Sequence, residues 1–142
     1  MILDASVAAK WFLLDEELAP EAQAVRTLML QQRVGMIAPP ILWTELAHAV
    51  IRAVRRDRLQ QDEARALADE MTDVRALVEA VEVDLHDTIR TALLVGVSAY
   101  DAQYLALGSR ATETVITADR IMWERGRASG YDVTWLGDVA HD

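Results

Sequence analysis

The 142-residue sequence contains no cysteine, only three prolines, a single phenylalanine and no long apolar run. Without cysteine there are no disulfides and no thiolate metal ligands, so a reducing compartment is allowed and a cytoplasmic location is expected. Without an apolar stretch of about 18 residues, no membrane-spanning segment is expected. The first residues, Met1 to Asp4, lack the basic and apolar regions of a secretory signal, so none is expected here.

Positive charge is also scarce. Lysine and arginine number 14 against 23 aspartates and glutamates, which gives a net charge of −9. Proteins that bind nucleic acid through a broad basic surface have the opposite balance. Any contact with nucleic acid would therefore be local, made by a few arginines and bound cations. Hydrophobic residues make up 52% of the chain, and its length suits one globular domain over residues 1–142.

Short apolar runs alternate with stretches of helical periodicity, a pattern typical of an α/β domain with a parallel sheet. The expected strands are 1–3, 36–38, 81–83, 114–117 and 131–136. The expected helices are 6–13, 20–32, 41–56, 61–77, 84–96 or 87–96, 98–109 and 119–128. In the helix 20–32, we expect Ala24, Leu28 and Val25 to face the core.

Four acidic residues fall at one edge of this predicted sheet. Asp4 ends the first strand, and Asp119 lies two residues beyond the strand 114–117. Asp101 belongs to the first turn of a helix, and Glu45 lies near the start of a helix that follows a strand. Because sites in open parallel sheets form at the carboxyl ends of strands, these side chains are expected to converge. Crowded carboxylates repel one another, and oxygen ligands without cysteine suit Mg²⁺ or Mn²⁺.

Three of these acids also have a structural interpretation as helix caps. Asp4 and Asp119 each precede a predicted helix, where an aspartate side chain accepts a backbone hydrogen bond. Asp101 lies three residues after Ser98, the spacing of a capping box. Taken one at a time, these positions therefore leave capping and catalysis open.

Glu45 is harder to explain as a structural residue. It lies on the apolar stripe that Leu42 and Leu46 form along the helix 41–56. A carboxylate in such a place needs a partner, and its own helix offers only His48 or Arg52. A structural salt bridge and a place in an acidic site both remain open.

Four segments of the sequence resemble motifs of a known family. Asp4–Leu13, Pro39–Ala49, Ser98–Leu107 and Thr117–Arg120 resemble, in order, the four motifs of PIN-domain proteins, in particular VapC-type toxins of type II toxin–antitoxin systems. Together the motifs span nearly the whole chain. The resemblance implies a PIN-like three-layer α/β/α fold with a central parallel sheet of four to five short strands.

The resemblance also implies a function. Asp4, Glu45, Asp101 and Asp119 would be the acidic active-site residues and metal ligands. The family cleaves RNA with Mg²⁺ or Mn²⁺, usually forms homodimers and is silenced by a cognate VapB antitoxin. The expected activity is therefore that of a metal-dependent endoribonuclease acting as the toxin of a VapBC-type pair.

Supporting residues follow from the same resemblance. Ser6 and Thr117 would be hydroxyls close to the metal. From their position close to the acidic motifs in the sequence, and not from the resemblance, Lys10 and Arg120 are candidates for contacts with RNA phosphates; a role as plain counter-charges to the carboxylates stays open. The basic run 52–58 is interpreted either as a further phosphate-binding rim or as a solvated helix end. The segment Gly108–Glu113 departs from the family pattern and is expected to shorten the helix before the fourth strand.

The aromatic residues offer a test of the partner prediction. If some of Trp11, Phe12 and Trp43 have exposed side chains, they would hold an amphipathic antitoxin helix in a groove. Burial in the core is the alternative interpretation for most of the aromatic residues, including Trp123 and Trp135.

Three other classes of protein need residues that this sequence lacks. A haloacid-dehalogenase phosphatase needs a second aspartate where Ser6 stands, and a response-regulator receiver needs paired acids and a late lysine that are missing. A Rossmann-type nucleotide site needs a glycine-rich loop after the first strand, which is also missing. A PIN-fold interaction module without nuclease activity and a PIN ribonuclease of general RNA metabolism remain as alternatives.

Overall fold

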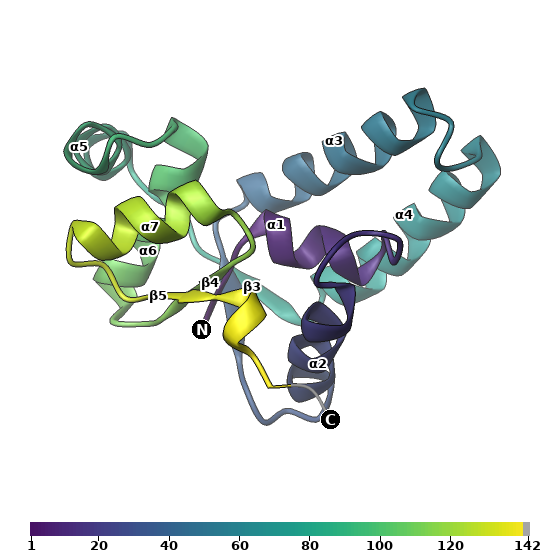
Figure 1. The fold of residues 1–142 in the computed structure, drawn as a ribbon, viewed down its shortest axis with the longest axis horizontal. Coiled ribbons are helices and arrows are strands. Elements are labelled where there is room, and N and C mark those ends of the chain that lie inside the picture. Colours follow the sequence, from purple (N-terminus) through teal and green to yellow (C-terminus); the bar gives the residue numbers. More distant parts are fainter. Residues whose placement is uncertain (141–142) are drawn as a thin grey trace.

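The structure is a computed structural model that describes residues 1–140, and it contains one five-stranded parallel sheet (Figure 1). The strands are β1 (Ile2–Leu3), β2 (Met36–Ala38), β3 (Val78–Ala80), β4 (Val115–Thr117) and β5 (Val133–Trp135). Their order across the sheet is β3-β2-β1-β4-β5, and every neighbouring pair is parallel. β1 is therefore the central strand, and its end at Asp4 lies in the middle of the carboxyl edge.

Helices fill the connections between the strands and cover both faces of the sheet. Over residues 1–140 they are α1 (Ala5–Ala8), α2 (Ala19–Leu30), α3 (Ile41–Arg55), α4 (Gln61–Arg75), α5 (Leu85–Val95), α6 (Ala99–Ala111) and α7 (Arg120–Ala128), with 3₁₀ turns η1 (Ala9–Trp11) and η2 (Leu136–Asp138). Crossovers between parallel strands are right-handed, so steps in opposite directions along the sheet place their helices on opposite faces. Figure 1 shows α2, α3 and α4 on one side of the sheet and α5, α6 and α7 on the other.

The strands supply the centre of the core. Ile2, Leu3 and Ile116 are almost completely buried, as expected for strands covered on both faces by helices. Leu42 of α3 and Leu105 of α6 pack into the same hydrophobic cluster. This packing fixes the helices relative to the carboxyl edge of the sheet, where the acidic residues lie.

Helix ends carry the signals that the sequence predicts. The Asp84 side chain caps α5 by accepting a hydrogen bond from the backbone N–H of Asp87 at 2.8 Å. The same helix ends at Gly96, whose φ of 77° is the left-handed conformation that glycine adopts without strain. Among residues 1–140, no helix is both long and apolar enough to cross a bilayer.

Two expected boundaries are wrong. The third strand is Val78–Ala80 instead of 81–83, because α4 already ends at Arg75 and pairing with β2 starts at once. Val78 is buried opposite Met36, and the three-residue length of β2 ends the pairing at Ala80. The expected helix 6–13 is instead the single turn α1 followed by the 3₁₀ turn η1.

The buried face of α2 also differs from the prediction. Ala22, Val25 and Met29 are buried, whereas Ala24 and Leu28 are only partly buried. The Trp11 indole donates a 2.8 Å hydrogen bond to the Ala22 carbonyl, which turns this face of the helix toward η1. Of the three residues expected to face the core, Val25 alone is buried.

Gly108 does not shorten α6. The helix continues to Ala111 and ends at Thr112, which takes the left-handed conformation with a φ of 54°. A Cβ at Gly108 would lie 2.6 Å from Cγ2 of Val115 and 3.0 Å from the Glu113 carbonyl oxygen. The glycine therefore lets α6 approach β4 closely, and the expectation of a shorter helix is wrong.

Candidate active site

The four predicted acids line one cleft at the carboxyl edge of the sheet. The cleft has a volume of about 630 Å³, and its lining includes Asp4, Glu45, Asp101 and Asp119. Asp4 follows β1, and Asp119 lies two residues after the neighbouring strand β4. Asp101 comes from the first turn of α6 and Glu45 from the second turn of α3. Residues spread over most of the chain are thus brought to one place, as the sheet topology predicts.

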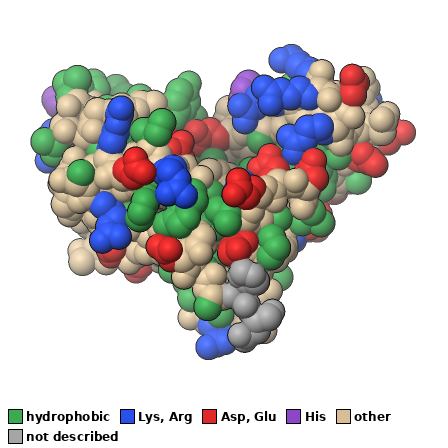
Figure 2. All heavy atoms as spheres, in the orientation of Figure 1, with side chains coloured by type: hydrophobic (Ala, Val, Ile, Leu, Met, Phe, Trp, Pro, Cys, Tyr) green, Lys and Arg blue, Asp and Glu red, His purple; other side chains and the backbone are tan. Residues whose placement is uncertain are grey.

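The cleft has an uneven distribution of charge. Figure 2 shows acidic side chains in the notch between the lobe that contains α5 to α7 and the arm formed by α3 and α4. Basic side chains gather on the arm, where Arg52, Arg55 and Arg56 are exposed at the end of α3. Arg52 also lines the cleft. A negative floor therefore lies beside a positive wall.

Asp4 is the most deeply buried of the four acids, with 4% of its surface exposed. Two hydroxyls donate hydrogen bonds to its Oδ2 atom, Thr117 at 2.7 Å and Ser6 over a short distance. Burial raises the pKa of Asp4 to about 7, and the charges of Glu45 and Asp101 act in the same direction against these two hydrogen bonds. In the chain without a bound cation, the Asp4 carboxyl group therefore titrates near neutral pH.

The same hydroxyls connect β1 to the segment that follows β4. The Ser6 oxygen accepts a hydrogen bond from the backbone N–H of Ala118 at 2.8 Å. The Thr117 oxygen accepts one from the backbone N–H of Asp119 at 2.9 Å. Ser6 and Thr117, the two hydroxyls that the resemblance singled out, thus connect Asp4 to the backbone of Ala118 and Asp119.

Glu45 has a partner that the sequence analysis missed. Tyr104 of α6 donates a short hydrogen bond to its Oε2 atom, and neither His48 nor Arg52 forms an ion pair with it within residues 1–140. Burial, and then the charge of Asp101, raise the pKa of Glu45 against this hydrogen bond. The sequence feature that could have indicated Tyr104 as a residue of the cleft is its spacing from Asp101, because residues three apart share a helix face.

Asp101 and Asp119 are held by helix caps as well as facing the cleft. The Ser98 hydroxyl accepts a 3.1 Å hydrogen bond from the Asp101 backbone N–H, and Oδ1 of Asp119 accepts a 2.9 Å bond from Met122. Burial, followed by the nearby charge of Asp119, raises the pKa of Asp101. Asp4, in contrast, makes no side-chain cap to α1. The capping interpretation therefore holds for Asp119 and fails for Asp4.

Within residues 1–140, none of the four carboxylates forms an ion pair with lysine or arginine. In the same part of the chain, no group of three or more aspartate, glutamate or histidine side chains is arranged so that it could hold a metal ion. The donor chemistry nevertheless fits a hard divalent cation, because the cleft offers carboxylate and hydroxyl oxygens and buries one carboxylate without a counter-charge.

The predicted RNA-contact residues have different surroundings. Lys10 lines the cleft, but its ammonium group pairs with Glu16 at 3.1 Å. The guanidinium carbon of Arg120 lies 4.6 Å from the ring centre of Trp135 and 5.9 Å from that of Trp123. Arg120 directly follows Asp119 and has no carboxylate partner within residues 1–140. Its guanidinium is therefore held by aromatic faces instead of an acid.

The condition for an aromatic partner groove is not met. Trp11 and Phe12 are buried in the core, with 2% and 6% of their surfaces exposed. Trp43 is partly buried, and the Arg75 guanidinium lies over its ring at 5.6 Å. These three residues therefore do not form an exposed groove that could hold a partner helix.

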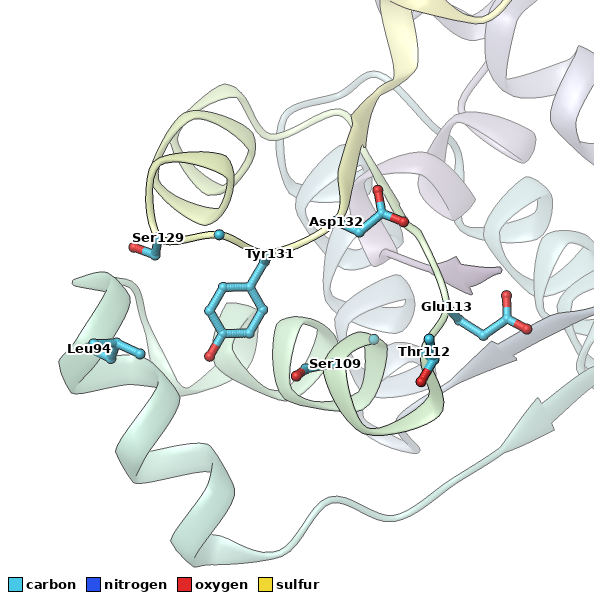
Figure 3. Close-up of a pocket in the computed structure, with 9 residues that line it drawn as sticks. Leu94, Ser109, Thr112, Glu113, Ser129, Tyr131 and Asp132 are labelled. Carbon is cyan, nitrogen blue, oxygen red and sulfur yellow. The ribbon is translucent and has the colours of Figure 1, made fainter.

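A second hollow lies at the amino edge of the sheet, the edge opposite the acidic cleft. Figure 3 shows Tyr131 projecting from the connection between α7 and β5 into the space between Leu94 and Ser109. The hollow measures about 390 Å³. Its two carboxylates are already engaged, Glu113 with the N-terminal ammonium group at 2.7 Å and Asp132 with the Thr114 hydroxyl at 2.6 Å.

A five-stranded parallel sheet with helices on both faces and an acidic cleft at its carboxyl edge defines a PIN-like α/β domain. No protein-family model matches the chain. The chain is 29% identical over 127 residues to Ribonuclease VapC3 of Pyrobaculum aerophilum, covering 88% of this chain and 93% of that protein. Its fold is similar to the crystal structure of PAE2754 from the same organism, with a TM-score of 0.70 and 17% identity over 96% of this chain and 88% of that one. The predicted resemblance to VapC-type PIN-domain proteins and the predicted PIN-like α/β fold are confirmed.

Proposed function

We propose that this protein is a metal-dependent endoribonuclease and the toxin of a VapBC-type toxin–antitoxin pair. The observation that carries the proposal is the cleft that Asp4, Glu45, Asp101 and Asp119 line without forming an ion pair with any lysine or arginine of residues 1–140. Such an arrangement is costly unless a cation balances the charge. The likeness to a protein named a ribonuclease supports RNA as the substrate.

Mg²⁺ or Mn²⁺ is the proposed cofactor, held by Asp4 and Asp101 with Asp119 completing the site. Bound there, such an ion lowers the pKa of a water molecule and stabilises negative charge on a phosphodiester. The chain's own contribution is orientation. Ser6 and Thr117 both donate to one oxygen of Asp4, so the other oxygen, Oδ1, is left for a ligand.

Glu45 is proposed to act at the same cleft, either as a further ligand or by orienting the attacking water. A carboxylate that accepts a hydrogen bond from water at the right distance also accepts its proton as attack begins. The raised pKa of Glu45, caused first by burial, suits a group that takes up a proton. Both roles require the carboxylate to stay in the cleft.

RNA phosphates are proposed to bind the basic wall beside the acids. Arg52 lines the cleft from α3 and has no acidic partner within residues 1–140, so it is a better candidate than Lys10, which pairs with Glu16. Arg120, held over Trp135 beside Asp119, is the second candidate. Guanidinium groups suit this task because they bind phosphate oxygens in pairs.

Two protein partners are also proposed, an antitoxin and a second copy of this chain. A VapB-like antitoxin is proposed as the inhibitor, on the likeness to VapC3. A homodimer is proposed through α5, where Leu85, Ile89 and Leu93 follow one another every four residues and are each more than half exposed. An apolar stripe of this kind on a helix normally faces a partner.

The test is cleavage of a mixed RNA pool by the purified protein with EDTA, then with added Mg²⁺ or Mn²⁺. We expect cleavage only with the metal and loss of cleavage in Asp101→Asn. Asp69→Asn, which removes an exposed acid of α4, is the matched control and should cleave normally. Cleavage in EDTA, or normal cleavage by D101N, would contradict the proposal.

Two further outcomes separate the alternatives. A protein that binds no Mn²⁺ in calorimetry and cleaves no RNA would be an interaction module with a PIN fold. A protein that cleaves RNA but does not stop growth when expressed without an antitoxin would be a PIN ribonuclease of general RNA metabolism. Growth arrest by the wild type, absent with D101N, supports the toxin.

A further inference from the structure

Tyr104 brings a hydroxyl group from the core to the acidic cleft. Its side chain is fully buried on α6, three residues after Asp101 and therefore on the same face of the helix. The hydroxyl donates a short hydrogen bond to Oε2 of Glu45, which belongs to α3. This bond joins two helices on opposite faces of the sheet, 59 residues apart in the sequence.

The bond restricts a side chain that otherwise has several rotamers. A glutamate has rotatable bonds on either side of each methylene group, so a carboxylate at the rim of a cleft samples many positions. A buried tyrosine hydroxyl keeps its acceptor, because the loss of that bond would leave a polar group unsatisfied in the core. Within residues 1–140, the other oxygen, Oε1 of Glu45, accepts no hydrogen bond. One oxygen is held and one remains for a ligand.

Packing alone does not account for the hydroxyl. A phenylalanine would fill the same space in the core, whereas the hydroxyl reaches Glu45, whose carboxylate accepts no other hydrogen bond within residues 1–140. Asp4 has two hydroxyl donors, and Asp119 is fixed as a helix cap. Tyr104 thus holds the Glu45 carboxylate by a hydroxyl hydrogen bond, as Ser6 and Thr117 hold the Asp4 carboxylate.

We infer that Tyr104 is a positioning residue, whose hydroxyl holds the Glu45 carboxylate in the orientation that the cation and the attacking water require. The inference rests on the proposed nuclease function. It predicts that removing the hydroxyl lowers both metal affinity and turnover while leaving RNA binding and the fold unchanged.

The first experiment measures RNA cleavage by Tyr104→Phe at saturating Mn²⁺. We expect kcat to fall about tenfold or more, equivalent to about 1.4 kcal/mol, while KM for RNA stays within about twofold. Tyr131→Phe, a tyrosine of the far hollow, is the matched control and should retain normal kcat. An unchanged kcat in Y104F would overturn the inference.

The second experiment is a double-mutant cycle on Mn²⁺ affinity, measured by calorimetry without RNA. If Tyr104 acts through Glu45, Y104F weakens Mn²⁺ binding in the wild type but has no further effect in Glu45→Gln. An equal loss in both backgrounds would show a general structural effect and overturn the inference. If the wild type itself binds no Mn²⁺, the proposed function fails and this inference fails with it; if the wild type binds and cleaves while Y104F is unaffected, the inference alone fails.

A third measurement does not depend on the folding of Y104F. Replacing Tyr100 and Tyr131 with phenylalanine leaves Tyr104 as the single tyrosine, because the chain has three. Its Cζ carbon, isotope-labelled and followed by NMR, should shift as Mg²⁺ is added, with the midpoint found by calorimetry. A resonance that stays in place while Mg²⁺ binds would overturn the inference.

Discussion

Without added divalent cations, the protein should become less stable as the pH rises, because Asp4 must ionise inside the fold. Its pKa is raised from 3.8 to about 7 by burial. The folded chain therefore holds the Asp4 proton more tightly than the unfolded chain does. The contribution of Asp4 to stability is therefore greatest below the unfolded value of 3.8, falls through the window up to about 7 and stays low above it.

The size of the effect follows from the same two values. From 3.8 to about 7, at about 1.4 kcal/mol for each pH unit, the full loss of unfolding free energy is about 4 kcal/mol. Part of this is already lost at about pH 5, so the fall between about pH 5 and about pH 8 should be about 3 kcal/mol. That is a large fraction of the stability of a small domain.

Asp4→Asn isolates this contribution. Asparagine cannot ionise, yet its side-chain oxygen still accepts hydrogen bonds from Ser6 and Thr117. Urea unfolding in EDTA, followed by tryptophan fluorescence, to which the buried Trp11 contributes, gives the free energy of unfolding at each pH. We expect D4N to be the more stable protein at about pH 8 and to lose less stability between about pH 5 and about pH 8.

Parallel pH curves for the wild type and D4N would refute the reasoning, because they would mean that Asp4 ionises as easily in the folded chain as in the unfolded chain. Addition of Mn²⁺ provides a second comparison. If the proposed site is correct, the cation should restore stability to the wild type at about pH 8 and do much less for D4N.

Three further predictions concern packing, assembly and RNA. Gly108→Ala should lower the free energy of unfolding by about 1–3 kcal/mol, because its Cβ would meet Val115 and the Glu113 carbonyl; urea unfolding equal to the wild type would contradict this. Ile89→Asp combined with Leu93→Asp should convert a dimer to a folded monomer in light scattering, and an unchanged mass would remove α5 as the interface. Arg120→Ala should raise KM for RNA several-fold with little change in kcat, whereas Arg33→Ala, an exposed arginine in the loop before β2, should not.

The four acids could be found from the sequence because one rule of topology places them. Strand ends in a parallel sheet share an edge, so Asp4 and Asp119 were bound to be neighbours once their strands were recognised. Glu45 and Asp101 required only the starts of two helices, which the periodicity marks clearly. The sequence order of the acids and their position after strands therefore contained enough information.

Details that depend on packing between helices were not predictable in the same way. The bond from Tyr104 to Glu45 depends on how α3 and α6 lie at the cleft, and no local pattern encodes that register. Likewise, the start of β3 is set by its pairing with the three residues of β2 and not by the valines at 81 and 83. The close approach of α6 to β4 at Gly108 is a third case, since a glycine in a helix normally indicates a break.

The central position of β1 has a consequence for the synthesis of the protein. Asp4 is synthesised before the Thr117 hydroxyl that holds it, because Thr117 lies 113 residues later in the chain. A nascent or truncated chain that stops before β4 has neither Thr117 nor Asp119, and its first strand has one neighbour missing. The complete cleft therefore cannot form until β4 and Asp119 have been synthesised, so a translation product that ends before them does not carry it.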